Sequence, residues 1–181
     1  MIVKSKSKRN RLTPIFKGKI IELNQEEITL PNGQAACFEI VRHPGATAIV
    51  PLKENGDVIL IRQYRYAVDE YLLEIPAGTL NPGEDPKSCA VRELEEEIGC
   101  QASRWQELLP IFTAPGFCDE EIHLYLAQGL RETKQHLDQD EIIERVEMPF
   151  SEAIARILDG TIRDAKSIAG LTRVYLQQQK K

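Results

Sequence analysis

The sequence predicts a mixed α+β fold, in which a β-rich first part precedes a domain built from strands and helices. Short strand-like runs dominate the first third of the chain, two of their joints are Asn-Gly dipeptides, and helix caps appear only from residue 85 onward. Asn-Gly readily supplies the positive φ angles of a tight hairpin turn. The length of 181 residues and the 42% share of hydrophobic residues suit one domain with a small accessory element.

Five strands are expected in the first third of the chain, at 14–23, 26–30, 36–43, 47–52 and 57–64. The Asn32-Gly33 and Asn55-Gly56 dipeptides should turn the chain between neighbouring strands, which favours antiparallel pairing. A break at His43-Pro44-Gly45 interrupts this pattern. We therefore expect a β-rich N-terminal element at residues 1–43 and a main domain at residues 44–181.

The first helix is expected after a short strand at 72–78 and a loop. It should span residues 86–98, because Asp85 can cap it, Pro86 suits its first position and Gly99 can end it.

Three further strands and two further helices are expected after this helix. The strands are expected near 106–113, 121–128 and 143–149. Two helices follow, one capped by Ser151 and ended at Gly160, the other beginning at Asp164.

The charge distribution disfavours nucleic acid as the main partner. The first eleven residues carry five basic side chains and no acid, which leaves 18 basic and 28 acidic side chains, a formal charge of −10, on the rest. We expect the basic terminus to be frayed and solvated. It lacks the apolar centre of a signal peptide, and no apolar run approaches the roughly 18 residues of a membrane span. A cytoplasmic protein without a membrane partner is expected.

Four cysteines show no spacing typical of a zinc site. They are Cys37, Cys89, Cys100 and Cys118. Free thiols are the simplest interpretation.

The helix at 86–98 should have an acidic face. Glu93, Glu96 and Glu97 fall within an arc of about 100°, at 100° per residue. A separate apolar stripe should contain Val91, Leu94 and Ile98.

This acidic face requires an explanation, because like charges three or four residues apart repel by a few tenths of a kcal/mol per pair. Arg92 relieves part of the repulsion by reaching Glu96. A divalent cation would turn repulsion into attraction, and carboxylate oxygens are hard ligands suited to Mg²⁺ or Mn²⁺. A solvated helix face is the alternative that these residues alone leave open.

The helix belongs to a longer pattern of fixed spacing, GTLNPGEDPKSCAVRELEEEIGC at residues 78–100. Its fixed identities are Gly78, Glu84, Arg92-Glu93, Glu96-Glu97 and Gly99, and an aliphatic residue, Leu94, stands between them. Seven fixed identities would coincide by chance with a probability on the order of 10⁻⁹ to 10⁻⁸ at a given start. This pattern resembles the Nudix box of the Nudix hydrolase superfamily. Cys100 departs from it, since an aliphatic residue is expected there, but a buried thiol is a small hydrophobe.

The resemblance implies an α/β/α sandwich around a mixed β-sheet and hydrolysis of a nucleoside diphosphate linked to another moiety. It implies Mg²⁺ as the cofactor, with Mn²⁺ as a substitute. The metal ligands would be Glu93, Glu96 and Glu97, together with the carbonyl of Ala77. Glu96 and Arg92 would serve catalysis, with Arg92 orienting the glutamates.

Two segments outside the box, RQYRYAVDEYLLEIPAG at 62–78 and TAPGFCDEEIHLYLA at 113–127, resemble the ADP-ribose pyrophosphatase branch. The resemblance implies that Arg65 contacts the diphosphate, as its planar fork of donors allows. The alternative for Arg65 is a surface ion pair with Asp69 or Glu70.

In the second of these segments, the resemblance places Glu120 near the terminal ribose and Pro115-Gly116 at the substrate. Asp119 and Glu121 are close enough to take the role of Glu120, and Pro115-Gly116 alternatively forms only a turn.

The general base of this branch lies in an acidic loop, which here reads HLDQDEIIE at 136–144. We choose Glu141, because it directly precedes an apolar run that would anchor it. Gln139 stands where some relatives carry a second glutamate and cannot take a proton. Either Glu141 acts alone, or Asp138, Asp140 or a hydroxide on the metal shares the task.

The expected reaction is Mg²⁺-dependent hydrolysis of ADP-ribose to AMP and ribose 5-phosphate. GDP-mannose is an alternative substrate, since pyrophosphatases for other sugar nucleotides share much of the pattern. Members of the branch form homodimers, so the resemblance also implies a homodimer that uses the N-terminal element. Two rivals are a Nudix-like sensor that binds nucleotide sugars without cleaving them and a hydrolase of damaged nucleoside triphosphates.

Overall fold

The computed structural model describes residues 6–137 and 142–180. The chain divides into two compact units, which are described one at a time. The first contains the residues up to Gly45 together with Phe112–Glu120, and the second contains Ala46–Ile111 and the residues from Glu121 onward. The division predicted at residue 43, with a role in dimerisation for the first part, stays a prediction.

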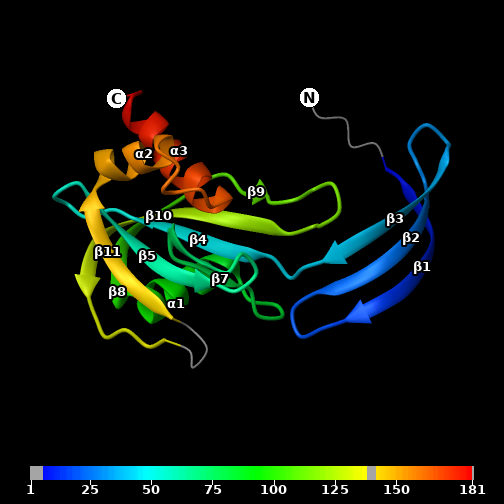
Figure 1. The fold of residues 1–181 in the computed structure, drawn as a ribbon, viewed down its shortest axis with the longest axis horizontal. Coiled ribbons are helices and arrows are strands. Elements are labelled where there is room, and N and C mark those ends of the chain that lie inside the picture. The colour runs from blue at the N-terminus through cyan, green and yellow to red at the C-terminus, as the bar shows by residue number, and fades with distance from the viewer. Residues whose placement is uncertain (1–5, 138–141, 181) are drawn as a thin grey trace. The chain divides into compact units, whose positions relative to one another are not determined.

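The first unit is built on an antiparallel sheet in the order β1-β2-β3 (Figure 1). Its strands are β1 (Lys8–Lys17), β2 (Glu22–Thr29) and β3 (Ala35–Arg42). The turn predicted at Asn32-Gly33 is confirmed between β2 and β3, where Gly33 has a φ of 85°.

Two sequence predictions in this unit are wrong. The run at 14–23 forms parts of two strands, because the chain turns where the amide of Gly18 donates to the carbonyl of Ile21 at 2.9 Å. Residues 1–5 lie outside the described residues, while residues 8–11, although exposed to solvent as predicted, belong to β1 and are therefore not frayed. Their basic side chains face acids of β2, with Arg9 3.7 Å from Glu26 and Arg11 3.7 Å from Glu27.

The second unit contains two sheets. One has the order β7-β4-β10-β8 and is mixed, because β4 (Ala46–Pro51) runs parallel to β10 (Glu121–Glu132). Its outer strands are β7 (Ala77–Thr79) and β8 (Cys100–Glu107). The other sheet is antiparallel, with β5 (Asp57–Arg65) between β11 (Ile143–Pro149) and β6 (Glu70–Glu74). A two-residue strand, β9 (Ile111–Phe112), lies between β8 and β10 in the chain.

Two strand boundaries differ from the prediction. The strand expected at 72–78 is divided into β6 and β7 around Pro76, which has no amide to donate to a ladder. The strand expected at 106–113 begins earlier, at Cys100, because the chain enters β8 directly from the end of the preceding helix and pairs Cys100 with Glu132.

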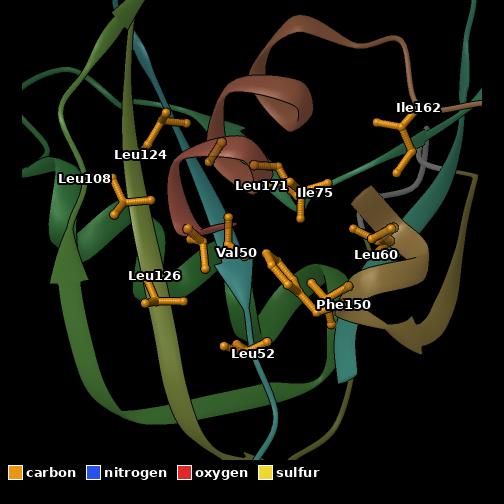
Figure 2. Packing of buried hydrophobic residues seen from close by; sticks show 14 of the residues in the cluster. Val50, Leu52, Leu60, Ile75, Leu108, Leu124, Leu126, Phe150, Ile162 and Leu171 are labelled. Carbon is orange, nitrogen blue, oxygen red and sulfur yellow. The ribbon is translucent and has the colours of Figure 1, made fainter. Parts of the chain in front are cut away.

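Helices cover both faces of these sheets, which confirms the expected α/β/α sandwich (Figure 1). α1 (Pro86–Ile98) packs through Ala90, Leu94 and Ile98 against Ile49 and Ile59 on one side. On the other side, α2 (Phe150–Leu158) and α3 (Ala165–Gln178) enclose a second core. Figure 2 shows this core, with Leu171 of α3 close to Val50 and Ile75.

Two of the three predicted helix starts are confirmed. Asp85 caps α1 by accepting from the amide of Ser88 at 3.0 Å, and Asp164 caps α3 by accepting from the amide of Ser167 at 2.9 Å. The Ser151 cap is wrong. α2 begins at Phe150, whose side chain is buried and whose amide donates to the carbonyl of Gly56 at 3.1 Å.

None of the helices in the described part of the chain is long and apolar enough to cross a membrane. The four cysteines are free thiols, as predicted.

Candidate active site

The acidic face of α1 is partly buried. Glu93 is 7% exposed and Glu97 is 1% exposed, whereas the Glu96 side chain remains 40% exposed. The predicted apolar stripe is correct for Leu94 and Ile98 and wrong for Val91, which is 41% exposed. Ala90 takes the place of Val91, because positions 90, 94 and 98 repeat every four residues and face the sheet.

Arg92 holds the carboxylates of the box together. Its Nε and Nη2 atoms donate to the two oxygens of Glu84, each at 3.1 Å. Its Nη1 atom donates to Glu93 at 2.6 Å and to Glu96 at 2.8 Å. One guanidinium therefore compensates three carboxylates, which is more than the single contact to Glu96 expected from the helix spacing.

The loop before α1 lies directly against these glutamates. The amide of Ala77 donates to Oε2 of Glu97 at 2.8 Å, and the amide of Asn81 donates to Oε2 of Glu84 at 2.9 Å. A Cβ atom at Gly78 would lie 1.8 Å from Oε1 of Glu93, so only glycine fits beside that carboxylate as it stands. The suggested role of the Ala77 carbonyl as a ligand stays a prediction.

The donor set suits a divalent cation, although the side chains are arranged around Arg92. Among the residues that the structure describes, no group of three or more His, Cys, Asp or Glu side chains is arranged to hold a metal ion. Glu93 and Glu96 nevertheless reach one positive centre together, since both accept from Nη1 of Arg92. Hard carboxylate oxygens that reach one positive centre are the type of ligand that Mg²⁺ and Mn²⁺ prefer.

We expect the contact between Arg92 and Glu84 to make the protein sensitive to acid. The hydrogen bonds from Arg92 and then from the Asn81 amide lower the pKa of Glu84 from 4.5 to about 2. A lowered pKa stabilises the fold fully above pH 4.5, and the contribution is lost as the pH falls toward 2.

Glu84→Gln should therefore remove about 1 to 2 kcal/mol of this acid-dependent stability, measured by urea unfolding from pH 6 to pH 2.5. Glu54→Gln, which breaks an exposed pair with Arg104, is the control and should keep the wild-type pH profile. An unchanged profile in Glu84→Gln would contradict this assignment.

Arg65 is held from behind by a buried acid. Its Nε and Nη2 atoms donate to the two oxygens of Glu74 at 3.1 and 2.6 Å. Glu74 is 1% exposed and also accepts from Lys166 at 2.5 Å, while Lys166 lies 3.0 Å from Asp164. The surface pair considered for Arg65 is thus replaced by a pair with Glu74, since Asp69 accepts from Tyr64 and Glu70 pairs with Arg163.

The other predicted substrate residues lie in the first unit. Oε2 of Glu120 accepts from the hydroxyl of Thr113 at 2.7 Å, and Pro115 and Phe117 line a pocket of about 360 Å³. The pocket has apolar walls that include Phe38, and Arg42 bridges Glu26 and Asp119 at its charged edge. Gly116 lies between two pocket-lining residues, Pro115 and Phe117, in the turn formed by residues 115–117.

Glu141, the predicted base, lies outside the residues that the structure describes, together with Asp138, Gln139 and Asp140. The sequence patterns do not identify Glu74 or Arg42. Glu74 has a usable signal, because an acid in the LLEIPAG strand directly precedes the loop of the box. Arg42 has none, since only the packing of residues 112–120 on β3 brings Asp119 to it.

The glycine loop and the partly buried glutamates of α1 together offer hard oxygen donors, the kind of ligand that divalent metal ions prefer. Residues 41–171 match the family model described as the NUDIX domain. The chain belongs to the Nudix family and is a Nudix hydrolase. Nudix hydrolases generally act with divalent metal ions.

Similar proteins cover most of the chain. It is 39% identical to an ADP-ribose pyrophosphatase of Bacillus subtilis strain 168, over 91% of this chain and 90% of that one. It is 41% identical to an ADP-ribose pyrophosphatase of Mycobacterium tuberculosis, over 89% and 79%. It is also 40% identical to a methanol dehydrogenase activator of Bacillus methanolicus, over 91% and 90%.

A solved structure described as an ADP compounds hydrolase has the same fold. It superposes with a TM-score of 0.83 over 97% of this chain and 95% of that chain, at 23% identity.

Proposed function

We propose that this Nudix hydrolase cleaves the diphosphate of ADP-ribose with Mg²⁺, so that water and ADP-ribose give AMP and ribose 5-phosphate. The observation that carries the proposal is the cluster of Glu93, Glu96 and Glu97 on one turn of α1, backed by Arg92 and closed by the loop at Gly78. Similarity to two ADP-ribose pyrophosphatases, over 91% and 89% of this chain, supports the choice of substrate.

In this proposal some residues of the chain bind the metal ions or the diphosphate, and another orients the metal ligands. Glu93, Glu96 and Glu97 would hold the metal ions, which when bound neutralise the diphosphate and lower the pKa of water. Arg92 orients the carboxylates of Glu93 and Glu96 toward one point, because its Nη1 atom donates to both. Arg65 would bind the diphosphate through Nη1, the nitrogen that Glu74 does not engage.

Glu141 remains our proposal for the general base. Glu141→Gln should lower kcat by about a hundredfold and leave KM nearly unchanged, because glutamine retains the shape of the side chain but cannot take a proton. Single-turnover hydrolysis of ADP-ribose measures the chemical step. Glu144→Gln is the matched control, because Glu144 is an exposed acid that pairs with Arg62, and it should keep the wild-type rate. An unchanged rate in Glu141→Gln would eliminate this residue as the base.

The N-terminal unit supports a homodimer as part of this proposal. Its strand β1 and the turn that follows expose large apolar side chains, with Ile15 54%, Phe16 56% and Ile20 52% exposed, and such a surface favours association. Sedimentation at micromolar concentration tests it. A cytoplasmic location fits the four free thiols and belongs to the same proposal.

GDP-mannose is the second candidate substrate, since the chain is 40% identical to a GDP-mannose pyrophosphatase of Yersinia enterocolitica over 70% of its length. A panel of ADP-ribose, GDP-mannose, diadenosine polyphosphates and nucleoside triphosphates, with Mg²⁺, separates the alternatives. The proposal requires the highest kcat/KM on ADP-ribose. Binding of ADP-ribose without cleavage would favour a sensor and overturn it.

A further inference from the structure

The last turn of α1 ends in four carbonyl groups that cannot be satisfied inside the helix. They belong to Glu96, Glu97, Ile98 and Gly99, because the amide of Gly99 makes the final helical bond to the carbonyl of Glu95. Two of these four residues carry proposed metal ligands. The groups that bind these carbonyls therefore influence the positions of the Glu96 and Glu97 carboxylates.

Two of the four carbonyls accept from backbone amides of the segment that follows β10. The amide of Thr133 donates to the carbonyl of Gly99 at 2.7 Å, and the amide of His136 donates to the carbonyl of Glu96 at 3.0 Å. The approach is close, since a Cβ atom at Gly99 would lie 2.9 Å from the Gln135 nitrogen. Gly99, at a φ of 62°, is the residue that permits it.

Side chains bind the other two carbonyls. Nε2 of Gln135 donates to the carbonyl of Glu97 at 2.5 Å, and Nη1 of Arg145 donates to the carbonyl of Ile98 at 3.0 Å. Glu97 is thereby fixed at both ends, because its carboxylate accepts from the amide of Ala77. The positive charge of Arg145 also suits the C-terminal end of a helix.

Arg145 is itself held in place by acids of two strands. Glu132 of β10 accepts from Nη1 at 2.6 Å and from Nη2 at 2.7 Å. Glu147 of β11 also accepts from Nη2 and is bound by Lys53 at 2.6 Å. The end of α1 is thus bound through Arg145 to acids on two strands.

We propose that Gln135 and Arg145 are positioning residues for the hydrolysis, because they fix the last turn of α1 and with it the carboxylates of Glu96 and Glu97. The inference rests on the function proposed above. Neither residue needs to touch substrate. Helix ends fray when their carbonyls lose partners, and a catalytic constellation tolerates displacements of only about 0.5 Å. Groups that orient metal ligands in this way typically contribute about ten- to a hundredfold to metal affinity or rate.

Gln135→Met tests the role, since methionine has a similar length but cannot donate to the Glu97 carbonyl. We expect Mn²⁺ affinity, measured by calorimetry without substrate, to fall about tenfold, and kcat to fall about tenfold with KM within about twofold. The unfolding midpoint should move by only a few degrees, because the side chain lies at the surface. Gln101→Met is the matched control: Gln101 donates to the carboxylate of Glu95 at 3.0 Å and touches none of the four carbonyls. It should leave Mn²⁺ affinity and kcat unchanged.

Arg145→Lys provides a second, independent measurement, because lysine keeps the charge but loses the fork that serves Glu132 and the Ile98 carbonyl together. Its Mn²⁺ affinity should also fall about tenfold. Wild-type Mn²⁺ affinity in Gln135→Met, or an equal loss in Gln101→Met, would overturn the inference. If the wild-type protein binds Mn²⁺ but cleaves no nucleotide sugar, the proposed function is wrong. The Mn²⁺ affinity of Gln135→Met relative to that of the wild type still tests the positioning role in that case.

Discussion

Replacing Glu97 with glutamine is expected to lower kcat on ADP-ribose by about a thousandfold or more, with little change in folding stability. Glutamine has the same shape and its amide oxygen can still accept from the Ala77 amide, which Glu97 now binds at 2.8 Å. The loss is one negative charge at a position that is 1% exposed, where charge is weakly screened. If that charge holds a divalent ion, its removal withdraws the stabilisation that the ion gives to the reacting diphosphate.

The measurement compares initial rates at saturating Mg²⁺ with urea unfolding of the same preparations. Glu95→Gln is the control, because Glu95 lies on the same helix and binds only Gln101 among the hydrogen bonds identified for it outside the helix backbone. It should keep kcat within about twofold. Full activity in Glu97→Gln would remove the metal assignment, and equal losses in both variants would show that helix charge alone matters.

The limits of α1 are encoded locally and were therefore predictable. Asp85 accepts from the Ser88 amide, Pro86 occupies the first turn, and Gly99 takes the left-handed conformation at the end. Each of these preferences depends on residues within one turn of the chain. The same reasoning fails at Ser151, because a tertiary contact of Phe150 sets the start of α2.

The burial of the glutamates was not predictable from the helix pattern. Periodicity separates polar from apolar faces and assigns the polar face to solvent. Here the loop at Ala77 and Gly78 covers that face, so Glu93 and Glu97 are buried while Val91 is exposed. The residues of the box could be identified by their spacing, but their environment depends on contacts between segments that are distant in sequence.

Glu74 illustrates the same limit on a larger scale. Arg65 and Lys166, which both bind it, lie on either side of Glu74 in sequence and are 101 positions apart. No local pattern connects them. A motif can therefore draw attention to Arg65 or to Glu74 separately, but only the fold shows that Glu74 binds Arg65.

Replacing Glu74 with glutamine is expected to destabilise the fold by about 3 to 5 kcal/mol. Glu74 is buried between two cations, Arg65 at 2.6 Å and Lys166 at 2.5 Å. A buried ion pair contributes little net stability, because desolvation offsets the attraction, but removal of one partner leaves uncompensated buried charge. In a chain of this length the loss corresponds to a decrease of roughly 10 °C in the unfolding midpoint.

Calorimetric unfolding of Glu74→Gln and of Glu152→Gln, which breaks an exposed pair with Arg156 on α2, measures the difference. The exposed variant should change by less than about 1 kcal/mol. Adding Lys166→Met to Glu74→Gln should restore part of the stability, because it removes a cation that Glu74 no longer balances. If Glu74→Gln were as stable as the wild type, solvent would have to reach and screen the charges of Arg65 and Lys166. If stability recovers partly in the double variant while kcat does not, the stabilising role of Glu74 is separate from its orientation of Arg65. Only the carboxylate can accept two hydrogen bonds from Arg65, which we propose binds the diphosphate.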